Sequence, residues 1–209
     1  MTLVQEELTH PKDAATRHPI HVLLQRRWSP RAFTNRLIAP ETLHRMLEAA
    51  RWAPSAGNGQ PWAFIVAPRD DEAEFARLLG VLNEKNQEWA CDAAVLMLGL
   101  SATRRPDGKE HRLALYDLGL AVENLVVEGM ANDVYAHQMA GFDADAARLA
   151  YDIPDSHAVV SAIALGYPAD PVTLPDDLRE REQSPRARKP LAELVFRGRF
   201  GATAPVIAD

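Results

Sequence analysis

Three short apolar runs, separated by segments with helical spacing, constrain the fold of this chain more than any other feature. They are WAFIVA at residues 62–67, AAVLMLGL at 93–100 and AVVSAIALGY at 158–167. Runs of this length and composition are typical of strands that are buried on both faces. Helices between them would cover the resulting sheet, so the pattern predicts an α/β or α+β protein with three layers.

Helical patterns fill the intervals. Pro40 can open a helix in its first turn, where the missing N–H costs nothing, and Pro54 ends the apolar stripe that follows. Residues 20–25 and 70–89 also have helical spacing, and Asp143 can cap a helix that runs to Tyr151. A further short strand is expected at 134–137.

Two segments have an unusual distribution of apolar residues. Residues 112–132 form the longest predicted helix, and it is apolar around most of its circumference. Such a helix is buried, either in the core or in a subunit interface. Residues 168–190 are rich in Pro, Asp and Arg and have no core pattern, so they are predicted to wrap around the body or reach a partner.

Composition excludes several classes of function. The net charge of −6 leaves no electrostatic basis for general nucleic-acid binding or for attraction to anionic membranes. Cys91 is the single cysteine, so no intrachain disulfide can form, and a cytoplasmic protein is expected. The apolar run at 93–102 is half the length needed to span a bilayer. Residues 1–19 lack the apolar core of a signal peptide and are predicted to be a loose tail.

Common catalytic motifs are missing. The chain has no G-x-S-x-G, no H-E-x-x-H and no G-x-x-x-x-G-K-[ST], and its seven histidines lack metal-ligand spacing, so no metal is predicted. Gly57-Asn58-Gly59 imitates half of G-x-G-x-x-G but precedes a strand, so a Rossmann site is not supported. Cys91 is interpreted as a buried, inert thiol.

Arginines near both ends of the chain remain as candidate ligands. Arg27, Ser29 and Arg31 alternate, so in an extended segment their side chains point to one side. Arg186 and Arg188 repeat the spacing. Guanidinium groups match phosphate oxygens in pairs, which makes a phosphate site one interpretation. A solvated basic stretch is the other.

The segment PSAGNGQP at residues 54–61 is a loop by composition. Its small residues would let the backbone approach a flat ligand, and its Asn and Gln could recognise the edge of a heterocycle. An ordinary connection between a helix and a strand explains the same composition.

Seven motifs taken in order resemble the FMN-dependent nitroreductase family. They are RRWSPRAF, LHRMLEAARWAPSAGNGQPWAFIVA, NQEWACDAAVLML, YDLGLAVENLVVEGM, AHQMAGFD, ALGYP and RKPLAELV. The resemblance runs from about residue 24 to residue 200. It implies an α+β, three-layer α/β/α fold with a mixed central sheet, in which residues 20–209 form a single FMN-binding domain.

The resemblance also implies an intertwined homodimer with FMN at the subunit interface. The C-terminal segment, from about residue 168 to 209, would reach onto the partner. This arrangement would account for both the apolar helix at 112–132 and the stretch without a core pattern.

The resemblance places the family's FMN contacts on twelve positions. The phosphate positions fall on Arg27, Ser29, Arg31, Arg186 and Arg188. The loop that contacts the ring from the other subunit falls on Pro54, Ser55, Ala56 and Asn58. Ala140 and Gly141 fall beside flavin N5, and Asn86 falls near the pyrimidine edge.

The implied activity is oxidoreduction. NADPH or NADH would reduce the flavin, and a nitroaromatic, a quinone or a similar small oxidant would then take the electrons in a ping-pong cycle, with no side-chain acid or base required. The first alternative keeps FMN but assigns a storage or sensing role, or another flavin chemistry such as flavin destruction or dehalogenation. The second is an interaction domain with decayed sites.

Overall fold

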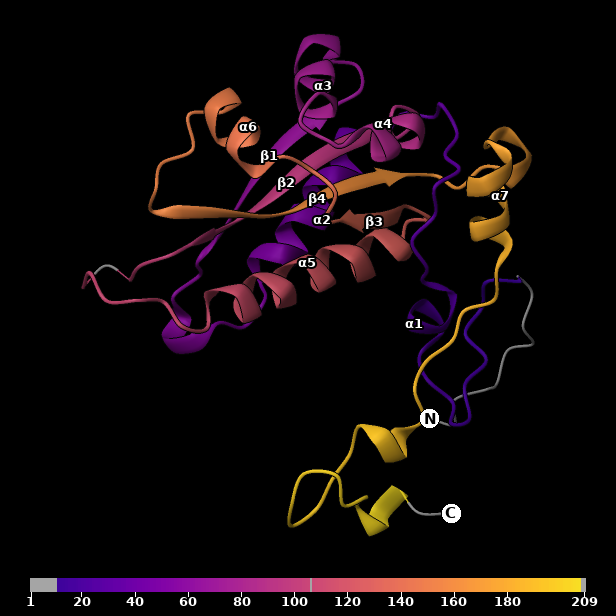
Figure 1. Ribbon diagram of the computed structural model, residues 1–209. Coiled ribbons are helices and arrows are strands. Elements are labelled where there is room, and N and C mark those ends of the chain that lie inside the picture. The colour runs from indigo at the N-terminus through magenta and orange to yellow at the C-terminus, as the bar shows by residue number, and fades with distance from the viewer. Residues whose placement is uncertain (1–10, 106, 208–209) are drawn as a thin grey trace.

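A four-stranded sheet forms the centre of the computed structural model, which describes residues 11–105 and 107–207 (Figure 1). Its strand order is β1-β2-β4-β3. The strands are β1 (Trp62–Pro68), β2 (Val95–Ala102), β3 (Tyr135–Met139) and β4 (His157–Gly166). The predicted strands are confirmed. The expectation of a mixed sheet is corrected, because all neighbouring strands among the described residues are antiparallel.

The connections set these strand directions. Two helices, α3 (Glu72–Leu79) and α4 (Glu84–Ala90), join β1 to β2 and return the chain to the end of the sheet where β1 finished. Pro68, the last residue of β1, therefore pairs with Val95, the first residue of β2. An apolar run has the same composition in either direction, so the sequence pattern does not encode this choice.

Helices cover both faces of the sheet, and the three layers are confirmed. Figure 1 shows α3, α4 and α6 (Ala144–Ala150) on one face and α2 (Pro40–Arg51) and α5 (Ala114–Met130) on the other. The side chains of β2 alternate between the two: Leu96 and Leu98 belong to the core beneath α3 and α4, whereas Val95 and Met97 belong to the core beneath α2 and α5. This is why β2 reads as a continuous apolar run.

The single helix expected at 70–89 is wrong. The structure divides it into α3 and α4 around residues 80–83. Gly80 is the C-cap of α3, and Asn83 caps α4 by accepting the backbone N–H of Asn86. The predicted cap of α6 is confirmed, since the Asp143 carboxylate accepts the N–H groups of Asp145 and Ala146.

The long helix α5 buries one face and exposes the other. Leu118, Ala121, Val122, Leu125 and Val126 lie in the core. Leu113, Leu115 and Tyr116, at or just before its first turn, are exposed by 51%, 62% and 66%. Among the described residues, nothing covers these side chains.

The prediction of no core pattern at 168–190 needs correction. This segment contains α7 (Asp176–Gln183), and Leu174 and Leu178 are buried in the core with α3 and α4. Beyond α7 the chain leaves the body: residues 191–207 extend away from the sheet (Figure 1), and Phe200 is 92% exposed.

The predicted N-terminal tail lies partly outside the described residues, which begin at residue 11. Lys12 and Asp13 are buried, and the backbone N–H of Ala14 donates to the carbonyl of Gln25 in the short helix α1 (Val22–Arg26). These residues therefore pack with the body. No described helix is long and apolar enough to cross a membrane.

Candidate functional site

The segment after α1 is extended and has the predicted alternation. Trp28 and Pro30 are buried, whereas Arg27, Ser29 and Arg31 are half-buried. The inward side chains fix the segment: the Trp28 ring lies 4.4 Å from the ring of Tyr135 in β3. The three predicted residues therefore lie on the less buried side of the segment.

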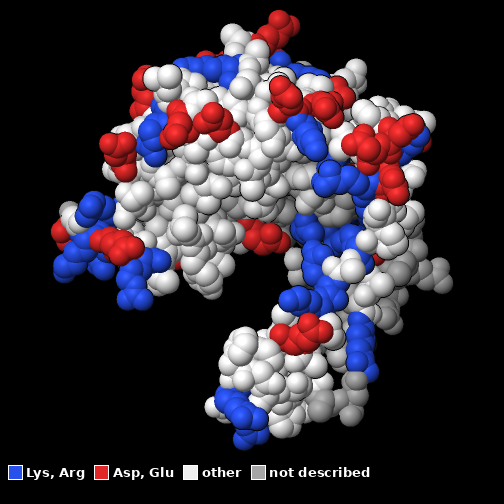
Figure 2. All heavy atoms as spheres, in the orientation of Figure 1, with Lys and Arg blue, Asp and Glu red and all other residues white. Residues whose placement is uncertain are grey.

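The two arginine motifs meet in space. Burial lowers the pKa of the Arg186 guanidinium, and the positive charges of Arg27 and Arg188 lower it further. Figure 2 shows basic side chains gathered where the N-terminal segment meets the chain beyond α7. We call Arg27, Arg31, Arg186 and Arg188 the basic cluster. Crowded positive charges depress one another's pKa and favour an anionic ligand between them.

A buried carboxylate holds one side of the basic cluster in place. Glu182 of α7 is 5% exposed. Its Oε1 accepts the indole N–H of Trp28 at 3.1 Å, and its Oε2 accepts the backbone N–H of Arg31 at 3.1 Å. The Arg31 guanidinium lies 3.8 Å from the same Oε2. Glu182 therefore joins α7 to the segment that carries Arg27, Ser29 and Arg31.

His137 of β3 supports the same segment from the sheet. Its Nδ1 lies 2.9 Å from the carbonyl oxygen of Pro30, and its ring centroid lies 4.5 Å from that of Trp89. Burial lowers the pKa of His137 to about 4, and the nearby charge of Arg31 contributes to this shift. The neutral ring therefore donates Nδ1–H to Pro30 at neutral pH.

Arg186 also braces the backbone. Its Nη1 donates to the carbonyl oxygens of Lys12, at 2.8 Å, and Gln25, at 3.1 Å. The Lys12 ammonium donates to the carbonyl of Ser184 at 2.6 Å. The two ends of the chain are thus tied together at the basic cluster.

Three further predicted residues, Asn86, Ala140 and Gly141, lie together just beyond the end of β3 that is farther from the basic cluster. The Gly141 carbonyl accepts the backbone N–H of Asn83 at 3.0 Å and the side-chain amide of Asn86 at 2.9 Å. A Cβ at Gly141 would lie 2.6 Å from Asn86 Nδ2 and would also collide with the amide of Asn83. Ala140 is exposed. The glycine is therefore required for this close approach.

The loop of residues 54–60 has an unusual backbone. Gly57, Asn58 and Gln60 have φ angles of 59°, 58° and 45°, in the left-handed region that disfavours side chains. Ser55 Oγ accepts the N–H of Gln60 at 3.0 Å. The Ala56 N–H donates to Oδ2 of Asp117 in α5 at 3.1 Å.

The loop and the basic cluster lie at opposite ends of the sheet. The loop leads into Trp62, which pairs with Ser101, and Ser101 pairs with Ala158 near the start of β4. The basic segment lies by the other end of β4, where Gly166 pairs with Tyr135 and Phe33 bridges to Pro168. At about 3.3 Å per residue, strands of this length separate the two by roughly 25–30 Å. One chain therefore does not bring Pro54, Ser55, Ala56 and Asn58 to its own basic cluster.

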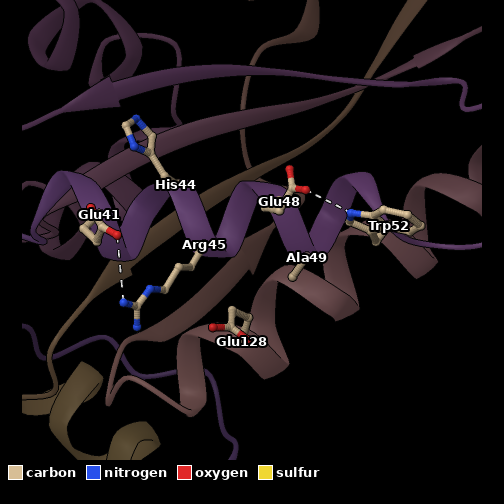
Figure 3. A pocket seen from close by; sticks show the side chains of 7 residues that line it. All are labelled: Glu41, His44, Arg45, Glu48, Ala49, Trp52 and Glu128. Atoms are coloured by element: carbon tan, nitrogen blue, oxygen red, sulfur yellow. Dashed lines mark hydrogen bonds and ion pairs between the residues drawn. The ribbon is translucent and has the colours of Figure 1, made fainter.

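A separate groove lies between α2 and α5 (Figure 3). Its charged groups are largely paired with each other: Glu48 accepts from Arg51 and from the indole N–H of Trp52, and Arg45 lies 3.9 Å from Glu41. The hydrogen bonds from Arg51 and Trp52 lower the pKa of Glu48 to about 2. None of the predicted ligand residues lines this groove, and we assign it no ligand. Its lining residues are Glu41, His44, Arg45, Glu48, Ala49, Trp52 and Glu128.

Sequence reasoning missed Glu182, His137 and Asp117, which hold the predicted ligand residues in place. Glu182 follows Leu174 and Leu178 at helical spacing, so a charged residue at a buried position was a usable signal. His137 and Asp117 have no comparable local signal, because their partners are distant in sequence.

Comparisons with known proteins identify the family and the fold of this chain. A family model described as the nitroreductase family matches residues 24–167. A crystal structure of an oxidoreductase containing FMN is 37% identical, with a TM-score of 0.85, over 94% of this chain and 100% of that one.

Two curated relatives are more distant. A putative NADH dehydrogenase/NAD(P)H nitroreductase from Archaeoglobus fulgidus is 28% identical over 71% of this chain and 84% of its own length. A 5,6-dimethylbenzimidazole synthase from Rhodospirillum rubrum is 26% identical over 83% of this chain and 93% of its own length.

Proposed function

The chain belongs to the nitroreductase family, and we propose that it is an FMN-dependent oxidoreductase that uses NADPH or NADH to reduce small electrophiles such as nitroaromatics or quinones. The observation that carries the proposal is the basic cluster. Arg27 lies beside Arg186 and Arg188 from the far end of the chain, and Arg31 lies on the same side of the extended segment, which buried side chains hold in place.

The residues present fit FMN. Arg27, Ser29, Arg31, Arg186 and Arg188 would hold its phosphate, since guanidinium groups match phosphate oxygens in pairs. Gly141 approaches Asn83 and Asn86 so closely that a Cβ would not fit, and their contacts fix the backbone beside the exposed Ala140. That backbone would lie near flavin N5.

Asn86 would also contribute through the backbone, in addition to the pyrimidine contact that its position predicts. Its side-chain amide donates to the Gly141 carbonyl, so it fixes the backbone that would lie beside the ring. A contact with the pyrimidine edge remains a prediction. Bound FMN would supply the redox chemistry, accepting a hydride from NAD(P)H and delivering the electrons to the oxidant.

The complete site would need two chains. Pro54, Ser55, Ala56 and Asn58 lie at the opposite end of the sheet from the basic cluster, so we place them in the site of a partner subunit. The exposed apolar residues at the start of α5 would pack against the partner subunit. The segment from about 168 to 209 would reach onto the partner. The protein would thus be a homodimer, and we keep the cytoplasm as its proposed location.

Similarity to the dimethylbenzimidazole synthase over most of the chain supports a second candidate, in which FMN serves another flavin chemistry with little NAD(P)H turnover. A storage or sensing role belongs to the same class. In each of these cases the phosphate site and the dimer would be the same, and only the reaction with a reduced nicotinamide would differ.

The test is a visible spectrum of the purified protein, followed by anaerobic addition of NADPH and of NADH. The proposal predicts a flavin spectrum that bleaches with at least one donor and returns when a quinone is added. A bound flavin that stays oxidised would favour the second candidate. A protein that neither contains nor takes up FMN would overturn both.

A further inference from the structure

Asp117 links the 54–60 loop to helix α5. It stands in the first turn of α5 and is 2% exposed. Its Oδ2 accepts the backbone N–H of Ala56 at 3.1 Å, across 61 residues of sequence. A buried carboxylate must be matched with donors, because burying an unpaired charge is costly.

The loop needs such an anchor. Asn58 and Gln60 have left-handed backbone conformations that non-glycine residues adopt only when the surroundings enforce them. The bonds within the loop, such as Gln60 N–H to Ser55 Oγ, are local. Among the described residues, the hydrogen bond that reaches residues 55–60 from another element comes from Asp117.

The same turn of α5 also borders an exposed apolar surface. Leu115 and Tyr116 point outward, next to the inward-facing Asp117. A subunit that packed on this surface would therefore contact the turn that holds the loop. The loop's shape and the subunit contact depend on one short piece of helix.

We propose that Asp117 is a positioning residue that fixes the 54–60 loop for contact with the FMN held by the partner subunit. The inference rests on the proposed function. It adds that the loop of one chain acts on the FMN held by the other chain. Loss of Asp117 acts on the FMN bound to the partner's basic cluster, while the basic cluster of the altered chain stays intact.

The first experiment measures FMN affinity of the apoprotein for Asp117→Ala. We expect FMN to bind at least tenfold more weakly than to the unaltered protein. Glu72→Ala is the matched control, since Glu72 is an exposed carboxylate in the first turn of α3, and its affinity should equal that of the unaltered protein.

The second experiment tests whether the Asp117 defect appears at the partner's FMN site or at the site of its own chain. Differently tagged Asp117→Ala and Arg31→Ala chains are co-expressed, and the heterodimer is purified through both tags. One of its two sites combines both defects, and the other combines an intact basic cluster with an intact loop. We expect one tight FMN per heterodimer, although each homodimer binds FMN weakly.

Ala56→Pro removes the same hydrogen bond from the donor side. Ser55 is already extended (φ −144°, ψ 154°), as a residue before proline must be, and Ala56 begins a short 3₁₀ turn. We expect Ala56→Pro to weaken FMN binding as Asp117→Ala does, and this single variant provides the comparison if Asp117→Ala does not fold.

The outcomes separate the two proposals. Unchanged FMN affinity in Asp117→Ala overturns the inference, and so does a heterodimer without a tight site, because the defect would then remain within its own chain. An unaltered apoprotein that binds no FMN would overturn the proposed function itself, and the inference would fall with it.

Discussion

The basic end and the loop end of the sheet carry the two halves of the proposed site, and they are held in different ways. At the basic end, the buried Glu182 and Trp28 and the half-buried His137 and Arg186 fix the arginines through contacts between segments far apart in sequence. At the loop end, residues 55–60 have strained backbone angles, local hydrogen bonds and the contact from Asp117. The comparison indicates that the basic cluster is preformed in one chain, whereas the shape of the loop depends on its neighbours.

The largest effect is expected for Glu182→Ala at the basic end. The change leaves the Trp28 indole N–H and the Arg31 backbone N–H without their acceptor in a buried place, and it removes the counter-ion of Arg31. The free energy of unfolding should fall by about 3–5 kcal/mol. Urea denaturation of the apoprotein measures it. Glu180→Ala, at an exposed position on the same helix, should change the free energy of unfolding little. Equal losses for the two variants would contradict the conclusion that Glu182 holds Trp28 and Arg31 in place.

His137 should make the basic end sensitive to acid. Its pKa of about 4 in the folded protein lies below the ordinary 6.5, so between these values the unfolded chain binds more protons. The part of the folding stability that depends on a neutral His137 is fully present above pH 6.5. It is lost as the pH falls toward 4, by up to about 3 kcal/mol. Denaturation at several pH values should show a shallower slope in this window for His137→Gln than for the exposed His44→Gln. Parallel slopes would refute a His137 that stays neutral in the folded protein throughout this window.

Arg31→Ala should affect the ligand more than the fold. Losing one charge-assisted phosphate contact should weaken FMN binding by about 1.5–3 kcal/mol. Riboflavin, which lacks the phosphate, should bind the variant and the unaltered protein alike. Fluorescence titration measures both, with Arg45→Ala on α2 as the control. An equal loss for both ligands would place Arg31 away from the phosphate.

The smallest effect is expected at the loop end. Ser55→Ala removes the acceptor of the Gln60 N–H in a partly exposed place, where water can replace it. The free energy of unfolding should fall by about 1 kcal/mol. Combined with Glu182→Ala, the losses should add, because the two sites lie far apart. If the loss of unfolding free energy in the double variant differed strongly from the sum of the two single losses, the two ends of the sheet would be coupled within one chain.

The sequence predicted the elements better than their directions. The runs that became β1, β2 and β4 are apolar because helices cover both faces of the sheet, and this composition is visible locally. The mixed sheet was wrong because strand direction depends on the helices that connect the strands. The division of 70–89 depended on Gly80 and Asn83, whose cap geometry outweighed a continuous helical spacing.

The candidate ligands were easier to find than the residues that hold them. Arg27, Ser29 and Arg31 alternate visibly, and the structure has the burial alternation that the spacing predicted. Their supports, Glu182 and His137, are distant in sequence and become relevant only after the chain folds. Whether the twelve predicted positions contact FMN stays a prediction, because that contact requires the ligand and a second chain.

The ties between distant segments also have a consequence for biosynthesis. The Trp28–Glu182 hydrogen bond spans 154 residues, and that of Arg186 with Lys12 spans 174, whereas the Ala56–Asp117 contact spans 61. A ribosome that adds about 5–20 residues per second would release Asp117 several seconds before Glu182. The nascent chain can thus form the loop end early, but it has no complete basic cluster until almost all of it has been translated. At the proposed site, capture of FMN would therefore be an event of the finished chain, and a prematurely terminated product would compete little for the cell's flavin.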